Sequence, residues 1–301
     1  MFKKYINKLV DNLPNDITKV KKPIPIDIIL DGGMFNGSYL IGALYFLKEM
    51  EKRKYITVDR ISGCSIGSLV GVLYCVDRLD LYMSMYSFVL NQFKQTYNLK
   101  LIKDLKSLVG DQIPMDVCKR MEKKMYISYY NINKWSKKVK CKYKNIDDIF
   151  DTIAKSCFVP YVIDGNILYK NKYFDGISPY IFKEKPNKKI LFMYLLGYDK
   201  ITYIINVKNE KDNLHRVFNG ILDIYTFFIK KHNTSMCSYV NDWNIIHKMN
   251  YQLKLGIEIF IHLFVYFVVF VKTYILTKVG KKYCVRIIKK LYMSLLDNYC
   301  F

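Results

Sequence analysis

The apolar positions in the first quarter of the chain alternate between short strand-like runs and longer helical patterns. Residues 24–30 are almost continuously apolar, and residues 56–61 form a second short run of the same kind. Both are predicted to be strands. The patterns that follow them, over 40–47 and 68–76, predict helices. The order strand, turn, helix, strand, turn, helix indicates an α/β fold with parallel strands.

Beyond this opening the pattern is less regular. Residues 80–145 are rich in Met, Tyr and Lys, and we expect them to form a helical insertion. The later predicted elements are an amphipathic helix with polar capping residues over 146–156, a hairpin over 162–169, strands over 190–196 and 203–207, and a helix over 217–231.

A long apolar stretch covers residues 257–276, interrupted by Glu258, His262 and Lys272. Its length approaches the ~20 residues that a bilayer-spanning helix needs. It is therefore interpreted either as a membrane-embedded or in-plane anchor, or as a buried core helix. Basic residues follow it, and by the positive-inside rule they would hold this end in the cytosol. These residues are Lys278, Lys281, Lys282, Arg286, Lys289 and Lys290.

The patterns divide the chain into three parts. Residues 1–23 are a basic lead-in, residues 24–207 are the α/β domain, and residues 208–301 are a helical C-terminal region that contains the hydrophobic segment and a basic tail.

Composition limits the partners that this chain can have. The 301 residues carry a net charge of +22, which suits nucleic acid, an anionic membrane or simply a solvated lysine surface. Lysine far outnumbers arginine, and arginine is the residue that base and phosphate recognition favours, so no nucleic acid is expected. The eight cysteines are scattered, and no apolar signal region opens the chain. An intracellular, reducing compartment without a cysteine-bound metal is expected.

A nucleophile-elbow pattern stands between the second predicted strand and its helix. Gly63, Ser65 and Gly67 fit Gly-x-Ser-x-Gly. The glycines let the backbone turn tightly and lift the serine hydroxyl clear of the sheet edge. The start of the helix behind it favours negative charge nearby. Ser65 is therefore a candidate nucleophile.

A glycine-rich turn, Asp31–Ser38, follows the first predicted strand. It fits neither G-x-G-x-x-G nor a P-loop, so a nucleotide-phosphate loop is disfavoured. The alternatives are a structural turn and an oxyanion hole, in which consecutive backbone N–H groups face a developing negative oxygen. An elbow serine one βα unit later favours the oxyanion hole. Asp175 ends an aromatic run before Gly176, and it is either a turn aspartate or a functional carboxylate.

Together these pieces resemble the patatin-like phospholipase family. The resemblance rests on four blocks in order, which are residues 31–37, 63–67, 154–160 and 165–176. It implies a three-layer α/β/α fold with a central, mostly parallel sheet, here with a hydrophobic C-terminal extension. It also implies a serine–aspartate dyad. In this chain the resemblance assigns the role of nucleophile to Ser65 and the role of general base to Asp175. It assigns the oxyanion hole to Gly32, Gly33 and Met34. The glycines that match the family motifs are Gly37, Gly63, Gly67 and Gly176.

The resemblance predicts a lipid acyl hydrolase that uses no metal or cofactor and acts on a phospholipid or another acyl-ester lipid. The protein is expected to be cytoplasmic and held at a membrane surface by its hydrophobic segment. Met34 and Asn36 depart from the family pattern, which has glycine and a basic residue there, so a catalytically inactive membrane-binding or scaffold protein is the alternative. A soluble esterase is a further alternative, as is a Ser-Asp-His triad that uses His215 or His232.

Overall fold

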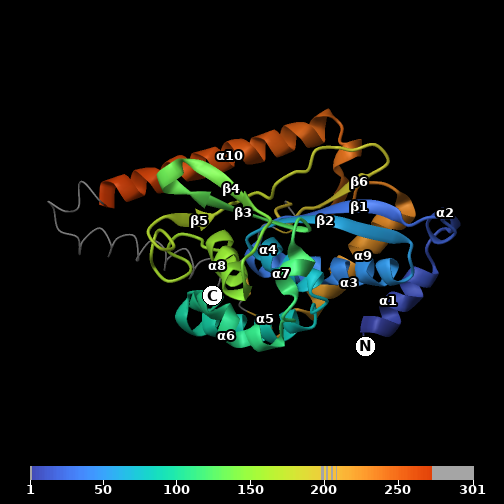
Figure 1. The fold of residues 1–301 in the computed structure, drawn as a ribbon, viewed down its shortest axis with the longest axis horizontal. Helices are drawn as coiled ribbons and strands as arrows, with labels where there is room; N and C mark the ends of the chain where they lie inside the picture. Colours follow the sequence, from blue (N-terminus) through green and yellow to red (C-terminus); the bar gives the residue numbers. More distant parts are fainter. Residues whose placement is uncertain (1, 198–199, 201–202, 205, 208, 273–301) are drawn as a thin grey trace.

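A seven-stranded mixed sheet lies at the centre of the protein, with helices on both of its faces (Figure 1). The structure, a computed structural model, describes residues 2–197, 200, 203–204, 206–207 and 209–272. The strand order is β4-β3-β2-β1-β6-β7, and β5 pairs with β3. The three-layer α/β/α prediction is therefore confirmed.

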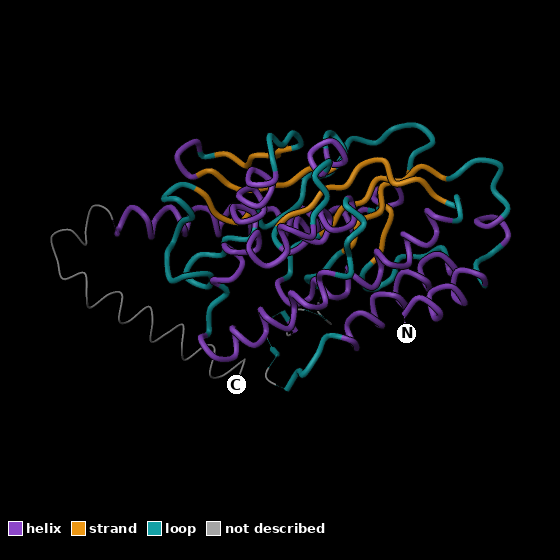
Figure 2. Tube along the Cα trace, turned by 60° about the horizontal axis from the view of Figure 1, so that its bottom comes forward, coloured by secondary structure: helices purple, strands orange, loops and turns teal. Residues whose placement is uncertain are grey.

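Four of the strands run parallel and form the middle of the sheet. β1 pairs in parallel with β2 and β6, and β2 pairs in parallel with β3, whereas β4, β5 and β7 join antiparallel. The strands form a single layer, drawn orange in Figure 2. The strands are β1 (Ile24–Leu30), β2 (Ile56–Cys64), β3 (Met125–Asn131), β4 (Ser136–Lys140), β5 (Tyr173–Asp175), β6 (Lys189–Met193) and β7 (Cys237–Tyr239).

The helices divide unequally between the two faces of the sheet. In Figure 1, α3, α4, α8 and α9 lie on one face, and α10 lies along the other. The helices are α1 (Phe2–Asp11), α2 (Asn15–Thr18), α3 (Gly37–Lys52), α4 (Ile66–Cys75), α5 (Leu81–Thr96), α6 (Leu105–Val109), α7 (Val117–Met121), α8 (Ile146–Ser156), α9 (Leu214–Lys230) and α10 (Ile245–Phe270). The 3₁₀ turns are η1 (Met34–Asn36), η2 (Lys100–Asp104), η3 (Gly110–Gln112), η4 (Ile132–Lys134) and η6 (Val240–Asp242).

Strand β1 shows how the sequence pattern builds two cores. Ile26, Ile28 and Leu30 belong to the large cluster beneath the sheet, whereas Ile29 belongs to a smaller cluster on the opposite face. Side chains alternate between the faces of a strand, so a continuous apolar run can only be buried when both faces are covered.

Helices α3 and α9 cross with their backbones almost in contact. A Cβ on Gly42 would lie 2.0 Å from the Val217 carbonyl oxygen, and one on Gly220 would lie 2.0 Å from the Tyr39 carbonyl oxygen. Only glycine fits at either position, so this pair of glycines fixes how closely α9 lies against α3.

Several predicted elements agree with the structure. The strands over 24–30 and 56–61 are β1 and β2, and the strand over 190–196 corresponds to β6. The helix over 146–156 is α8, and the Asn145 side chain caps it by accepting a hydrogen bond from the Asp148 N–H at 2.9 Å.

Others do not. Residues 80–145 form helices only as far as Met121 and then contribute β3 and β4 to the sheet. No hairpin forms over 162–169, because the Tyr161 N–H donates to the Asn166 carbonyl at 2.8 Å and closes a local loop instead. The described residues of 203–207 form no strand. The hydrophobic segment predicted over 257–276 forms the C-terminal part of a longer helix, α10, which begins at Ile245, and the last residues of the segment and the basic tail lie outside the described residues.

Candidate active site

Ser65 stands on the sharp turn between β2 and α4, as the pattern predicts. Its backbone has φ of +49° and ψ of −132°, which is a strained conformation for a residue with a side chain, and the residue is 8% exposed. The turn presses against the end of β1, because a Cβ on Gly67 would lie 2.5 Å from the Leu30 carbonyl oxygen. A Cβ on Gly63 would in turn lie 2.5 Å from the Gly67 carbonyl oxygen.

A chain of serines holds this strained turn in place. The Ser65 N–H donates to Ser156 Oγ at 2.9 Å, and the Ser156 hydroxyl donates to the Ser128 carbonyl at 2.6 Å. Ser68 Oγ donates to the Ser65 carbonyl at 2.6 Å. Ser156 lies within the block 154–160 that supports the family resemblance, but the sequence alone indicates no role for it. Its contact with Ser65 joins residues 91 positions apart, and no local signal indicates it.

Asp175 ends β5 and is 6% exposed. Burial raises the pKa of Asp175 to about 6, although a hydrogen-bonding interaction with the Ser65 side chain opposes the rise. The Ile177 N–H also donates to Asp175 Oδ1, at 2.8 Å. The structure therefore brings Asp175 to Ser65, and it leaves Asp175 a stronger base than an ordinary aspartate.

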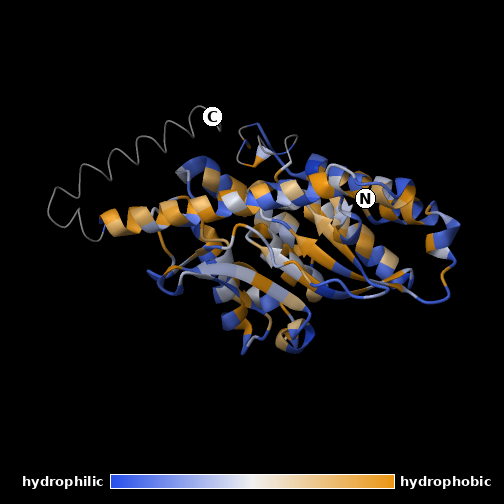
Figure 3. Ribbon diagram, turned by 90° about the horizontal axis from the view of Figure 1, so that it is seen from above, coloured by the Kyte–Doolittle hydropathy of each residue, from blue (hydrophilic) through white to orange (hydrophobic). Residues whose placement is uncertain are grey.

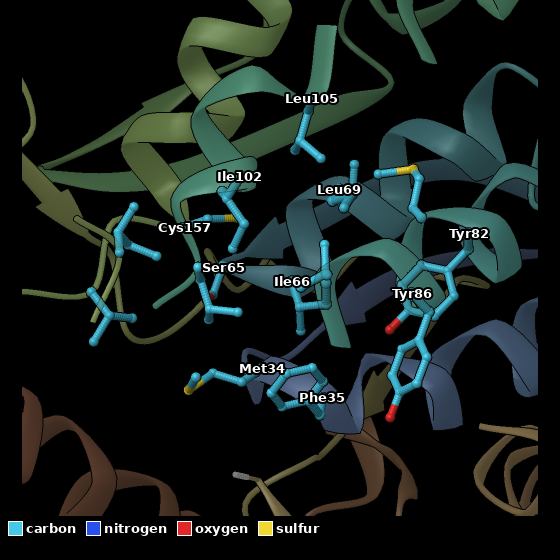
Figure 4. Close-up of a pocket in the computed structure, with 15 residues that line it drawn as sticks. Met34, Phe35, Ser65, Ile66, Leu69, Tyr82, Tyr86, Ile102, Leu105 and Cys157 are labelled. Atoms are coloured by element: carbon cyan, nitrogen blue, oxygen red, sulfur yellow. The ribbon is translucent and has the colours of Figure 1, made fainter. Parts of the chain in front are cut away.

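The glycine-rich turn becomes η1 at the start of α3. The Gly32 N–H donates to the side chain of Asp31 at 3.0 Å, so this N–H is already engaged. Met34 adopts φ of +46°, the left-handed region that glycine prefers, and its side chain lines the pocket beside Ser65 (Figure 4). The Gly-to-Met departure thus keeps a glycine-like backbone.

The second departure, Asn36, is fully buried and fills a structural role. Its amide donates to the Leu195 carbonyl at 3.2 Å and to the Lys200 carbonyl at 2.9 Å. Its oxygen accepts from Arg216 at 2.6 Å. Arg216, on α9, is itself fully buried and paired with Glu210. The guanidinium of Arg216 therefore lies behind the glycine-rich turn, although the sequence alone did not indicate this residue.

The pocket in front of Ser65 is almost wholly apolar. Figure 4 shows Ser65 among side chains from the glycine-rich turn, α4, α5 and η2. The lining residues are Met34, Phe35, Ser65, Ile66, Leu69, Tyr82, Met85, Tyr86, Val89, Leu99, Ile102, Leu105, Cys157, Val159 and Ile163. Such a lining suits an apolar chain far better than a charged or sugar-like ligand.

Helix α10 reaches both loops of this site from the far side of the sheet. Lys254, 8% exposed, donates to the fully buried Asp31, the residue just before Gly32. Glu258 accepts from Lys137 at 2.7 Å and also from Ser178, three residues after Asp175. In the sequence, Glu258 was only an interruption of an apolar stretch, and Lys254 only a basic residue before it.

Among the described residues, no histidine hydrogen-bonds to Ser65 or Asp175. His262 stacks on Tyr130, with ring centroids 3.9 Å apart, and His215 lies 3.4 Å from Glu210. Within the same residues, no group of three or more His, Cys, Asp or Glu side chains is placed to hold a metal ion.

A serine on a strand-to-helix elbow, beside a glycine-rich turn and an apolar pocket, has the geometry of a nucleophile elbow in an α/β fold. Residues 28–177, about half of the chain, match the model of the family described as Patatin-like phospholipase. This part of the chain therefore belongs to the patatin-like phospholipase family, whose members are typically hydrolases of lipid esters. A comparison with curated proteins found no match.

Proposed function

We propose that this protein is a lipid acyl hydrolase that uses Ser65 and Asp175 as a catalytic dyad. The observation that carries the proposal is the placement of Ser65, on a strained elbow, beside a buried carboxylate whose pKa is raised to about 6. A base of that pKa is largely ionised at neutral pH and still accepts a proton usefully. The apolar pocket supports an acyl chain as the group bound next to it.

The mechanism is acyl transfer to water. Asp175 takes the proton of Ser65, and the serine oxygen attacks the ester carbonyl carbon of the lipid. The alcohol part of the lipid leaves with a proton returned by Asp175, and an acyl-enzyme ester remains. Water, deprotonated by Asp175, then attacks this ester, releases the fatty acid and restores Ser65.

The oxyanion of each tetrahedral intermediate needs backbone N–H donors. We assign these donors to Gly33 and Met34 on the glycine-rich turn and to Ile66 at the start of α4. Gly32 has a positioning role in this scheme, because its N–H donates to Asp31. The chemistry needs neither a metal nor a cofactor.

The proposed substrate is a phospholipid or another acyl-ester lipid, met at a membrane surface on the cytoplasmic side. A net charge of +22 favours anionic headgroups, and the one described helix that is long and apolar enough to cross a membrane is α10.

The proposal is tested by acyl release from mixed phospholipid vesicles. Ser65→Ala is expected to lower the rate by about 10³-fold or more, and Asp175→Asn by about 10²-fold or more. The exposed residues Ser107 and Asp111 provide matched controls, and Ser107→Ala and Asp111→Asn should leave the rate unchanged. A folded wild type with no activity on any acyl ester would contradict the proposal and favour an inactive membrane-binding protein. Activity confined to short soluble esters would favour the soluble esterase.

A further inference from the structure

From Lys254 onward, helix α10 presents its charged residues to the protein and its apolar residues to the outside. Lys254, Glu258, His262 and Val265 follow one another at helical spacings of four, four and three, and this side faces the domain. Lys254, Glu258 and Val265 are buried, and the His262 side chain is only 10% exposed. The usual order of a surface helix, apolar inward and polar outward, is therefore reversed.

The outward face is a continuous apolar surface. Between 255 and 271 the exposed side chains of this helix carry no charge. Figure 3 shows α10 lying over the domain, with its C-terminal half coloured as hydrophobic. The most exposed members are Ile257 at 53%, Ile259 at 60%, Phe260 at 71%, Leu263 at 53%, Phe264 at 58% and Phe267 at 60%. Apolar patches of this kind mark an interaction surface.

The inward face fixes the helix to the domain along its length. Lys254 pairs with the fully buried Asp31, and Glu258 pairs with Lys137. Farther along, Tyr266 lies against Trp135 with ring centroids 3.9 Å apart, and Val268 packs on the cluster around Phe174.

These contacts are incompatible with a helix that crosses a bilayer on its own. Crossing would remove Lys254 and Glu258 from their partners and expose both charges to hydrocarbon, which is strongly unfavourable. It would also leave Asp31 buried without its cation. A bilayer that contacts α10 in its docked position meets only the outward face, so the helix lies in the plane of the membrane.

We propose that the outward face of α10 is a docking surface for an anionic lipid bilayer, with the helix parallel to the membrane and still attached to the domain. Basic residues next to this face favour an anionic bilayer as its occupant, and an aromatic side chain beside it suits a membrane interface. Trp135, 52% exposed, flanks the face, a position that aromatic side chains favour at membrane interfaces, and Lys272 follows the apolar stretch. The sequence after it adds six basic residues between 278 and 290 and no acidic one.

The inference takes the lipid as partner from the proposed function, but its test does not depend on catalysis. Binding is measured by flotation of the full chain, carrying Ser65→Ala, with vesicles of phosphatidylcholine alone or with 30% phosphatidylserine. Phe260→Gln with Phe264→Gln is expected to weaken binding to the anionic vesicles by about 10-fold or more. The matched control, Phe88→Gln with Met115→Gln, replaces two exposed apolar residues elsewhere and should change binding less than 2-fold.

The outcomes separate the alternatives. Stronger binding to the anionic vesicles, lost in the α10 variant alone, supports the proposal, as does release of the bound protein by alkaline carbonate. Retention in the carbonate pellet would show a spanning helix and overturn the proposal.

A concentration-dependent dimer broken by the α10 variant, without vesicle binding, would identify a second copy as the occupant. A monomer that binds no vesicles would also overturn the proposal. Vesicle binding by a wild type without acyl hydrolase activity would contradict the proposed function but not the docking surface on α10.

Discussion

At the level of single residues, two features of the site are energetically unfavourable. Ser65 holds a left-handed backbone, and Asp175 is a carboxylate removed from water. Strained backbone and buried charge of this kind persist only where the surrounding structure enforces them, and they gather at functional sites. Here the serine chain through Ser156 and the glycines of the elbow hold the Ser65 backbone.

The raised pKa of Asp175 predicts the pH dependence of the activity. The dyad works only when Asp175 is ionised, so kcat/KM should rise with pH, reach half its plateau near the pKa of about 6, and be flat above pH 7.5. The measurement is acyl release from vesicles between pH 5 and 8, with binding checked by flotation at each pH. A rate that stays constant over this range would contradict the assignment of Asp175 as the base.

The same pKa makes a prediction about stability. The ordinary pKa of 3.8 is raised to about 6 in the folded protein, so ionised Asp175 destabilises the fold at pH 8, by about 3 kcal/mol at most. Asp175→Asn removes that charge and should be about 1–3 kcal/mol more stable than the wild type at pH 8. The difference should shrink as the pH falls through 6 towards 4, because the wild-type carboxyl is then protonated.

Urea unfolding at pH 8 and pH 5 measures this effect. Asp111→Asn, at an exposed carboxylate, is the control and should leave the free energy of unfolding unchanged at both values. An Asp175→Asn variant that is less stable than the wild type at pH 8 would show that the carboxylate is stabilised rather than strained in the folded state.

The residues of the candidate dyad were predictable because local pattern marks them. A five-residue motif between a strand and a helix indicated Ser65, and an aspartate–glycine pair after an aromatic run indicated Asp175. Ser156, Arg216 and Lys254 could not be found in this way. Each contacts a partner at least 91 positions away in the sequence, and a contact between residues so far apart in the chain produces no local sequence pattern.

At the level of elements, the pairing of α3 with α9 positions the glycine-rich turn, because α3 begins at Gly37, near the end of this turn. Gly220→Ala would place a methyl group against the Tyr39 carbonyl oxygen, and the clash cannot be relieved by moving a side chain. We expect it to lower the free energy of unfolding by about 3 kcal/mol. Acyl hydrolysis should fall as well, because α3 must shift.

Gly256→Ala is the matched control, since nothing lies within 4 Å of a Cβ at that position of α10. Alanine favours a helix over glycine by up to about 1 kcal/mol, so this variant should be equally or more stable. Equal destabilisation by both substitutions, in thermal and urea unfolding, would contradict the close crossing.

The elements also show where sequence patterns stop being informative. β1 and α8 have clear apolar patterns and were predicted with their observed bounds, whereas β2 was predicted with its observed start but three residues too short. β3 and β4 were not predicted, because β4 consists largely of Lys and Ser and β3 contains polar residues among its apolar ones. Their strand structure comes from pairing with β2 and with each other, which is a tertiary effect.

At the level of the whole molecule, α10 connects the outer surface to the site. Its outward face is the proposed lipid surface, and its inward face reaches Asp31 at the start of the glycine-rich turn and Ser178 beyond Asp175. The sequence predicted an apolar segment but left its burial open. Its docking could not be predicted, because it depends on isolated charges that pair with residues far away in the chain.

The contact between Lys254 and Asp31 makes this connection testable. Asp31 accepts from the Gly32 N–H at 3.0 Å and from the Leu195 N–H at 3.4 Å, so it holds the glycine-rich turn against the end of β6. Burial opposes the charge on Lys254, but Asp31 outweighs it and the pKa of Lys254 is raised. Lys254→Met leaves a buried carboxylate without its cation, and it should lower the free energy of unfolding by about 3–5 kcal/mol.

Lys189→Met removes an exposed pair with Asp242 and serves as the control, with an expected cost of less than about 1 kcal/mol. Asp31→Asn added to Lys254→Met removes the buried charge and should restore most of the stability. It should not restore kcat, because a neutral side chain holds the Gly32 N–H less firmly and the oxyanion donors beside it are less well placed. Recovery of stability without recovery of kcat would therefore show that α10 acts on the site through this ion pair. Full recovery of both would reduce Lys254 to a counter-charge, and α10 would then be a lipid-facing helix without influence on the chemistry.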